Sequence, residues 1–169
     1  MNILLSTNVF ITEGYGPLKQ LMSEYNTFNF GLELFPDFEN GIFNREVEEL
    51  KELVEDRPLS MHGPYFKVEH SAPKGTDTYD YAIDQINKTL ELCEDLKINH
   101  LVFHHNNKKI TDDNKQESII ESTENLHELN EICKESNVEI LVENAGVYAK
   151  ENVLFDEEEF ISMCKKEGN

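Results

Sequence analysis

Residues 79–105 read YDYAIDQINKTLELCEDLKINHLVFHH and combine one amphipathic helix with one apolar strand. In the first part, apolar side chains recur at the i, i+3, i+4 and i+7 spacing of one helix face, at Tyr79, Ala82, Ile83, Ile86, Leu90 and Cys93. In the second part, the run from His100 to Phe103 is short and apolar, as buried strands are. The stretch therefore predicts a helix that leads into a buried strand.

The same alternation of strand and helix recurs along the chain. Short apolar runs that predict strands occur at Asn2 to Leu5, Phe30 to Phe35, Pro58 to Met61, His100 to Phe103 and Val138 to Val142. Helical spacing is found at Phe43, Val47, Leu50 and Val54, and in a longer helix from about Lys115 to Ser136 with Ile119, Leu126, Leu129 and Cys133 on its apolar side. Helices between successive strands make parallel βαβ units, so the fold class is α/β.

Two α/β architectures compete for this pattern. Five βα units in 169 residues suit an open, doubly wound, flavodoxin-like sheet. That fold usually holds a phosphate at a glycine-containing turn after its first strand, and residues 6–12 contain no glycine. The strands instead begin about every 34 residues, so eight units would need about 270 residues, the size of a TIM barrel. We expect residues 1–169 to be a single, partial TIM-barrel domain, comprising the N-terminal five βα units of eight.

A further helix is predicted near residue 156. Asp156 suits the N-cap, acidic residues 157–159 suit the first turn, and Gly168 suits the position after the last turn. Its apolar side consists of Phe160, Ile161 and Cys164. In a barrel a sixth strand would come next, so we expect the chain to be the N-terminal part of a longer ancestor.

Charge and composition restrict the function. The chain has 34 acidic and 15 basic residues and a net charge of −19, which argues against nucleic acid as a partner because phosphate backbones bind basic surfaces. No apolar run is long enough to span a membrane, and the first residues lack a signal-peptide pattern, so we expect a cytoplasmic protein without a membrane partner. Cys93, Cys133 and Cys164 are widely spaced, which predicts reduced packing residues.

Three predicted strands end in side chains that can carry chemistry. The segments LSMHGPY, LVFHHN and ILVENAG place His62, His104 and Glu143 at the C-terminal ends of strands three, four and five. That end of a barrel carries the active site, and imidazole and carboxylate are ligands for zinc, manganese and similar ions. Strand alternation makes His104 a better ligand candidate than His105, which we expect to be structural or solvent-facing. The alternative is that these strand-end histidines only hydrogen-bond to loops.

At these residues the chain resembles the xylose isomerase-like TIM-barrel superfamily, which includes sugar and sugar-phosphate isomerases and epimerases and the endonuclease IV type of apurinic-site nuclease. The resemblance rests on His62-Gly63-Pro64-Tyr65, Val102-Phe103-His104 and Glu143-Asn144-Ala145-Gly146. It implies that Glu143 binds a divalent metal (Mn, Zn, Mg or Co) and can move the substrate proton. It also implies that His62 and His104 bind metal or line the substrate pocket.

The remaining assignments follow from that resemblance and from position. Glu33, at the end of strand two, is expected to contact substrate, and Asn144 to contact substrate or orient Glu143. The family's other ligands lie on strands six to eight and have no counterpart here, so we expect weak or absent metal binding by this chain alone. Four lysines in the loops either bind a substrate phosphate or belong to the solvated surface: Lys67, Lys74, Lys108 and Lys109. Four aromatic residues in the loops either line a sugar pocket or pack the loops: Phe10, Tyr65, Phe66 and Tyr148.

Three functions remain open. The first is a metal-dependent sugar or sugar-phosphate isomerase or epimerase, which transfers a proton at a carbon next to a carbonyl and has a small-molecule sugar as its partner. The second is an apurinic-site endonuclease, and the third is a non-catalytic barrel fragment. A barrel stopped after five strands has two open edges, so we expect self-association through them.

Overall fold

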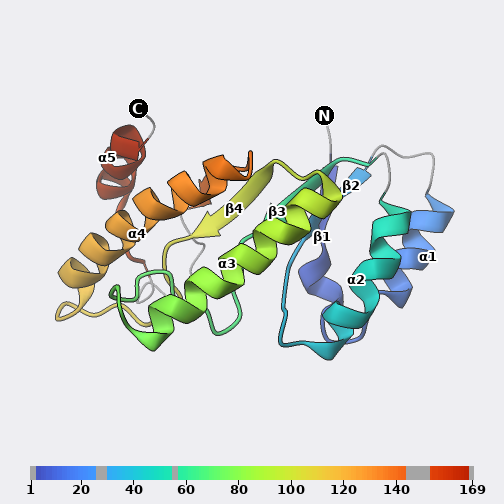
Figure 1. The fold of residues 1–169 in the computed structure, drawn as a ribbon, viewed down its shortest axis with the longest axis horizontal. Helices are drawn as coiled ribbons and strands as arrows, with labels where there is room; N and C mark the ends of the chain where they lie inside the picture. The colour runs from blue at the N-terminus through green and yellow to red at the C-terminus, as the bar shows by residue number, and fades with distance from the viewer. Residues whose placement is uncertain (1–2, 26–29, 55–56, 144–152, 168–169) are drawn as a thin grey trace.

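The computed structural model describes residues 3–25, 30–54, 57–143 and 153–167, in which parallel strands alternate with helices (Figure 1). In chain order the elements are β1 (Ile3–Ser6), the 3-10 helix η1 (Thr7–Phe10), α1 (Gly16–Glu24), β2 (Phe30–Leu34), α2 (Gly41–Leu53), β3 (Leu59–His62), α3 (Asp77–Leu96), β4 (His100–His104), α4 (Lys115–Glu135), β5 (Glu139–Glu143) and α5 (Glu157–Glu167). Each strand predicted from the sequence is present with its ends moved by about one residue, and Asn2 lies outside the described residues.

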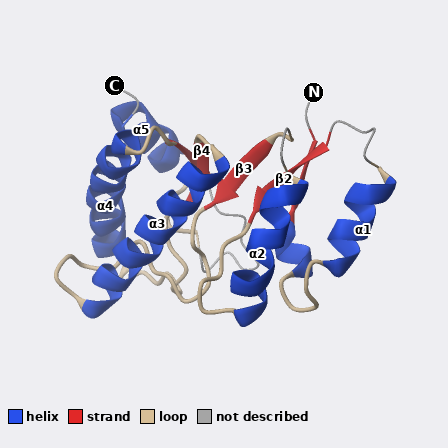
Figure 2. Cartoon of the chain, turned by 45° about the vertical axis from the view of Figure 1, so that its right-hand side comes forward, coloured by secondary structure: helices blue, strands red, loops and turns tan. Residues whose placement is uncertain are grey.

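The sheet order separates the two candidate architectures. The five strands lie in the order β1-β2-β3-β4-β5, and every neighbouring pair is parallel. A flavodoxin-like sheet would have the order 2-1-3-4-5 and helices on both faces. Here helices α1 to α4 follow one side of the sheet (Figure 2), as in the wall of a TIM barrel. The barrel interpretation is confirmed, and chain length alone was a poor guide.

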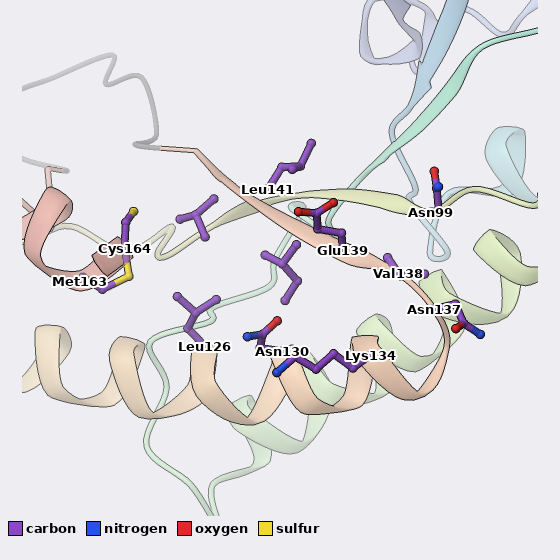
Figure 3. Close-up of a pocket in the computed structure, with 12 residues that line it drawn as sticks. Asn99, Leu126, Asn130, Lys134, Asn137, Val138, Glu139, Leu141, Met163 and Cys164 are labelled. Atoms are coloured by element: carbon purple, nitrogen blue, oxygen red, sulfur yellow. The ribbon is translucent and has the colours of Figure 1, made fainter. Parts of the chain in front are cut away.

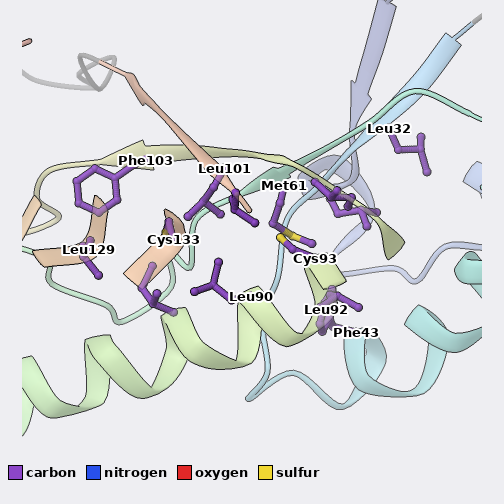
Figure 4. Close-up of a cluster of buried hydrophobic side chains, with 14 of the residues drawn as sticks. Leu32, Phe43, Met61, Leu90, Leu92, Cys93, Leu101, Phe103, Leu129 and Cys133 are labelled. Atoms are coloured by element: carbon purple, nitrogen blue, oxygen red, sulfur yellow. The ribbon is translucent and has the colours of Figure 1, made fainter. Parts of the chain in front are cut away.

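The hydrophobic core lies between the sheet and these helices (Figure 4). Leu32, Met61, Leu101 and Phe103 point from the strands toward the helices and are at most 1% exposed. Helices α2 to α4 meet them with residues that include Phe43, Leu90, Cys93, Leu129 and Cys133. Cys93 and Cys133 are buried free thiols, as their spacing predicts. Burying each such large apolar side chain stabilises the fold by roughly 1.5–3 kcal/mol.

Helices α3 and α4 end in the same way. The amide of Ile98 donates to the carbonyl of Cys93, and the amide of Val138 donates to that of Cys133. Between each pair stands one residue with a left-handed backbone, Lys97 at φ 57° and Asn137 at φ 56°. This is the Schellman arrangement, which satisfies the last carbonyls of a helix. It turns each helix directly into the next strand.

The start of α5 follows the sequence prediction. The Asp156 carboxylate accepts a hydrogen bond from the amide of Glu159, and the Glu159 carboxylate accepts one from the amide of Asp156. This reciprocal pair satisfies two amides that the first turn leaves free. The predicted C-terminal Gly168 lies outside the described residues.

The face of the sheet opposite the helices is left open along β4 and β5 by the residues that the structure describes. Along β4, Leu101 and Phe103 are buried against the helices, whereas His100, Val102 and His104 are only partly buried on the other face. Along β5 the residues of this open face are exposed, and Leu141 is 42% exposed. The open face corresponds to the interior of a complete barrel. It carries the strand-end side chains on which the functional argument rests.

Candidate metal centre

His62, His104 and Glu143 converge at the C-terminal ends of three adjacent strands. Each is the last residue of its strand, on β3, β4 and β5 respectively. One ligand atom from each residue lies within 4.8 Å of the others. The two histidine Nε2 atoms are 3.3 Å apart, and Nε2 of His104 is 3.0 Å from Oε2 of Glu143. The structure therefore brings together the three residues that the sequence proposes as ligands.

His62 is held with one ring nitrogen free for a ligand. Its Nδ1 atom lies 2.7 Å from the carbonyl oxygen of Gly63, and a carbonyl can only accept, so Nδ1 carries the proton and donates it. Nε2 then presents its lone pair to the centre. Burial lowers the pKa of His62 to about 4, which keeps the ring neutral. The ring of Phe35 stacks on it at a centroid distance of 3.9 Å.

His104 and Glu143 occupy the more open side of the group. The His104 side chain is 16% exposed and that of Glu143 is 52% exposed. Nδ1 of His104 is buried and has no hydrogen-bond partner within the described part of the chain. Tyr65 meets the His104 ring edge-on at a centroid distance of 5.5 Å. Within the group, the His62 side chain is therefore buried and the Glu143 carboxylate is accessible to solvent.

The donor set fits a divalent ion. Zinc binds imidazole nitrogen and carboxylate oxygen at about 2.0–2.2 Å, and two ligands of one tetrahedral ion then lie about 3.3 Å apart. The two separations that involve His104, 3.3 and 3.0 Å, agree with that spacing, and all three ligand atoms lie within 4.8 Å of one another. Two imidazoles and one carboxylate also leave a coordination position for water or substrate. The three residues are therefore a candidate site for a divalent metal ion.

Glu33 faces the same space from β2. Its strand position is level with Ser6 of β1 and Ser60 of β3, on the open face of the sheet. Burial raises the pKa of Glu33, a hydrogen bond from Ser6 partly offsets the rise, and the charge of Glu143 adds to it. The Glu33 carboxyl therefore lies on the same face of the sheet as His104 and Glu143. Asn144, the other predicted contact, lies outside the described residues.

Aromatic rings border the centre on the β2 and β3 side. Phe35 contacts Tyr65 and Phe66 at centroid distances of 5.9 and 5.5 Å. Phe10, by contrast, is partly buried against the hydrophobic core, and Tyr148 lies outside the described residues. Sequence reasoning missed Phe35, which ends an apolar run and resembles an ordinary core residue. Only its position one residue after β2 could have indicated a role at the strand ends.

Two loops beside the centre are tied together by one carboxylate. Glu69 accepts hydrogen bonds from the amide and hydroxyl of Ser71 in its own loop. It also accepts from the amides of Asn107 and Lys108 in the loop after β4. The Asn107 side chain donates to the carbonyl of Tyr65. These bonds fix the loop that carries Tyr65, and no local sequence pattern indicates them.

Two other histidines are structural. His105 is 3% exposed, and its Nδ1 is 2.8 Å from the hydroxyl of Ser122. His105 is therefore structural and not solvent-facing, because side chains alternate between the two faces along β4 and the residue after His104 points toward the helices. His70 is 4% exposed and its Nε2 is 3.1 Å from the carbonyl of Pro64, so this loop histidine is part of the interior.

A separate pocket of about 780 Å³ lies beside β5 and is lined by none of the three converging residues (Figure 3). Its apolar lining includes Leu126 of α4, Ile140 and Val142 of β5, and Met163 and Cys164 of α5. It follows the edge of β5 that has no strand partner among the described residues. The pocket therefore marks the open sheet edge and not the strand-end chemistry.

Comparison with known families agrees with this geometry. The model of the xylose isomerase-like TIM-barrel family matches residues 25–169, which include all three converging residues. The chain belongs to this family. A curated relative is a "Probable endonuclease 4" of Mycoplasmopsis pulmonis (strain UAB CTIP), with 24% identity over 107 residues. That alignment covers 63% of this chain and 36% of the relative.

Solved structures show the same fold. A D-tagatose 3-epimerase-like protein superposes with a TM-score of 0.73 at 17% identity, over 98% of this chain and 60% of its own. The IOLI protein with a bound zinc atom superposes with a TM-score of 0.70 at 14% identity, over all of this chain and 60% of its own. The present chain thus spans about three fifths of the length of these two structures, close to the share that five of eight βα units would occupy. Among the described residues, none of the helices is both long and apolar enough to cross a membrane.

Proposed function

We propose that this chain supplies the metal-binding part of a sugar or sugar-phosphate isomerase or epimerase, which transfers a proton at a carbon next to a carbonyl. The observation that carries the proposal is the convergence of His62, His104 and Glu143 at the strand ends. An electron-rich enediolate develops when such a proton is removed, and positive charge must stabilise it. A bound divalent ion supplies that charge.

Each residue has a distinct part in this proposal. His62 and His104 hold the ion through Nε2, and the hydrogen bond to Gly63 fixes the tautomer of His62. Glu143 is the third ligand, and its exposed carboxylate is the group placed to accept a proton from carbon. Glu33 and Asn144 bind substrate hydroxyls, and the aromatic residues restrict water at the buried side.

Metal binding by the 169-residue chain tests the proposal directly. Titration calorimetry with Zn²⁺ and with Mn²⁺ should give at most weak binding at one site, because the chain supplies only three ligands. Glu143→Gln should weaken the affinity by about tenfold or more while circular dichroism stays unchanged. Glu131→Gln, an exposed carboxylate on α4 paired with Lys134, is the matched control and should bind normally. Equal affinities in all three proteins would contradict the proposed centre.

An apurinic-site endonuclease is the second candidate, favoured by the relative described as a probable endonuclease 4. The net charge of −19 opposes it, because nucleases grip phosphates with basic surfaces. A duplex with one apurinic site, incubated with the chain and Zn²⁺, distinguishes the two. Cleavage that Glu143→Gln abolishes would favour the nuclease, whereas an intact duplex together with sugar epimerisation would favour the first candidate. Metal binding without either activity would identify a non-catalytic barrel fragment.

We also propose that the chain associates with a second copy of itself through the edges of β1 and β5, which have no strand partner in the part of the chain that the structure describes. Ile3 and Leu4 on β1 are 66% and 40% exposed, and Leu141 on β5 is 42% exposed. Apolar residues beside unpaired strand edges favour association. Light scattering on the purified chain tests this, since a monomer at high concentration contradicts it. The buried free thiols Cys93 and Cys133 support our proposal of a reducing, cytoplasmic location.

A further inference from the structure

We propose that Asn107 and Glu69 are positioning residues of the metal centre, because together they hold the Tyr65 ring against His104. This inference rests on the proposed function and adds two residues that lie outside the group of three ligands. An imidazole that is already oriented toward an ion binds it with a smaller loss of conformational freedom. The orientation of the His104 ring is therefore part of the metal affinity.

The two histidines of the centre are oriented in different ways. Nδ1 of His62 donates to the carbonyl of Gly63, so a hydrogen bond fixes that ring. Nδ1 of His104 is buried and has no hydrogen-bond partner among the described residues, and its Nε2 faces His62 and Glu143, which are themselves ligands. From outside the ligand group, Tyr65 meets the His104 ring edge-on at a centroid distance of 5.5 Å. The packing of Tyr65 therefore does for His104 what the hydrogen bond does for His62.

The side-chain amide of Asn107 holds the backbone that carries Tyr65. Its Nδ2 atom donates to the carbonyl of Tyr65 at 2.9 Å and to the carbonyl of Val68 at 2.5 Å. The Tyr65 carbonyl also accepts from the amide of Val68, so residues 65–68 form a tight turn. Lys67 in this turn has a left-handed backbone at φ 61°, a conformation that persists where the surrounding structure holds it. Asn107 supplies that support from the loop after β4.

Glu69 in turn fixes the position of Asn107. Its Oε2 atom accepts from the backbone amides of Asn107 and Lys108, at 2.8 and 2.5 Å. Its Oε1 atom accepts from the amide and the hydroxyl of Ser71, at 3.0 and 2.6 Å. Hydrogen bonds to a charged acceptor are stronger than those between neutral groups. Because each loop supplies two of the four donors, the carboxylate ties the loop after β3 to the loop after β4.

The two loops support each other's histidine. Tyr65 lies three residues after His62 and packs on His104, whereas Asn107 lies three residues after His104 and holds Tyr65. Tyr65 also meets the His62 ring, at a centroid distance of 6.2 Å, so one side chain contacts both imidazoles. Loss of the Asn107 amide should therefore release Tyr65 and leave the His104 ring free to turn away from the centre.

Asn107→Ala tests the inference, and Ser71→Ala is its matched control. Asn107→Ala removes both bonds to the turn, whereas Ser71→Ala removes one bond within its own loop and leaves the two loops connected. NMR on the metal-free full chain would record the nuclear Overhauser contact between the ring protons of Tyr65 and His104. We expect this contact in the parent protein and in Ser71→Ala and its loss in Asn107→Ala, with one circular dichroism spectrum for all three.

Two further measurements extend this comparison. Glu69→Gln can keep at most two of the four bonds, because an amide nitrogen cannot accept, so it should weaken the same ring contact. Zn²⁺ affinity, measured by competition with a chromophoric chelator, should fall about tenfold in Asn107→Ala, as is typical when a residue that supports a ligand is lost. The Zn²⁺ affinity of Ser71→Ala should equal that of the parent protein.

The outcomes separate the inference from the proposed function. A contact between Tyr65 and His104 that survives in Asn107→Ala and Glu69→Gln would overturn the inference and leave the proposed function standing. Loss of the contact without a change in Zn²⁺ affinity, or an equal loss in Ser71→Ala, would also overturn it. A parent protein that shows the contact but binds neither Zn²⁺ nor Mn²⁺ would contradict the proposed function, while the NMR comparison still decides whether Asn107 and Glu69 place Tyr65.

Discussion

The backbone of Gly63 links His62 to the neighbouring strand. The Gly63 carbonyl accepts the Nδ1 proton of His62 at 2.7 Å, and the Gly63 amide donates to the carbonyl of Val102 at 2.6 Å. A Cβ atom at this position would lie 2.9 Å from that same Val102 carbonyl oxygen, which is backbone and cannot move aside. The orientation of His62 therefore depends on the absence of a side chain at residue 63.

Gly63→Ala should disturb both stability and metal binding. The new methyl must separate β3 from β4, which we expect to cost about 1–3 kcal/mol of unfolding free energy. The shift also tilts His62, so Zn²⁺ affinity should fall. Urea unfolding and calorimetry measure the two effects. Gly16→Ala is the control, because a Cβ there meets nothing within 4 Å. Two variants with equal stability and equal affinity would show that this close approach is unimportant.

Much of this site follows from strand position alone. His62, His104 and Glu143 each end an apolar run, and parallel strands bring such ends together at one edge. Side chains alternate between the two faces of a strand, so His104 and the next residue, His105, point to opposite faces of the sheet. The role of Phe35 could not be predicted, because an aromatic residue at the end of an apolar run has the same local pattern in a core and in a pocket wall. The bonds of Glu69 join residues 38 and 39 positions apart, which no local rule detects.

Acid should destabilise the fold through His70. Burial lowers the pKa of His70 to about 4, below the ordinary value of 6.5. Between these two pH values the unfolded chain binds a proton at this residue and the folded chain does not. The stabilisation is complete above pH 6.5 and is lost as the pH falls toward 4, by about 3 kcal/mol in total. His62 and His105 have lowered pKa values for the same reason and add to the loss.

Urea unfolding between pH 7.5 and 5 measures this dependence. His70→Gln should be less stable at pH 7.5, since the ring contact with Phe103 is lost, but its stability should fall less steeply with acid. An unfolding free energy that depends on pH equally steeply in His70→Gln and in the parent protein would contradict the role of His70.

Lys97→Gly should stabilise the chain. Lys97 is exposed and holds a left-handed backbone at φ 57°, which costs a residue with a Cβ free energy that glycine avoids. We expect a gain of about 0.5–1 kcal/mol in thermal or urea unfolding. Asn137→Gly, at the equivalent end of α4, should gain less because asparagine tolerates this conformation better. A loss of stability in Lys97→Gly would show that its side chain contributes more than its backbone costs.

Leu141→Lys should weaken self-association. Leu141 points from β5 into the open face with 42% exposure, and a charge there opposes contact with a second copy. Sedimentation should show a shift toward monomer with unchanged unfolding free energy, because the side chain is outside the core. Ile120→Lys, on an exposed position of α4, is the control and should keep the parent association state. An unchanged state in Leu141→Lys would place the contact elsewhere.

The alternation of side chains between the two faces of β4 has an evolutionary consequence. Leu101 and Phe103 hold the strand to its helices, whereas His100, Val102 and His104 look into the open face. In a complete mutational scan, tolerance along this strand should oscillate residue by residue, with folding losses at odd positions and changes of ligand preference at even ones. Substitutions at the even-numbered positions can therefore change ligand preference while the odd-numbered positions keep the strand folded. This allows one fold to acquire different chemistries.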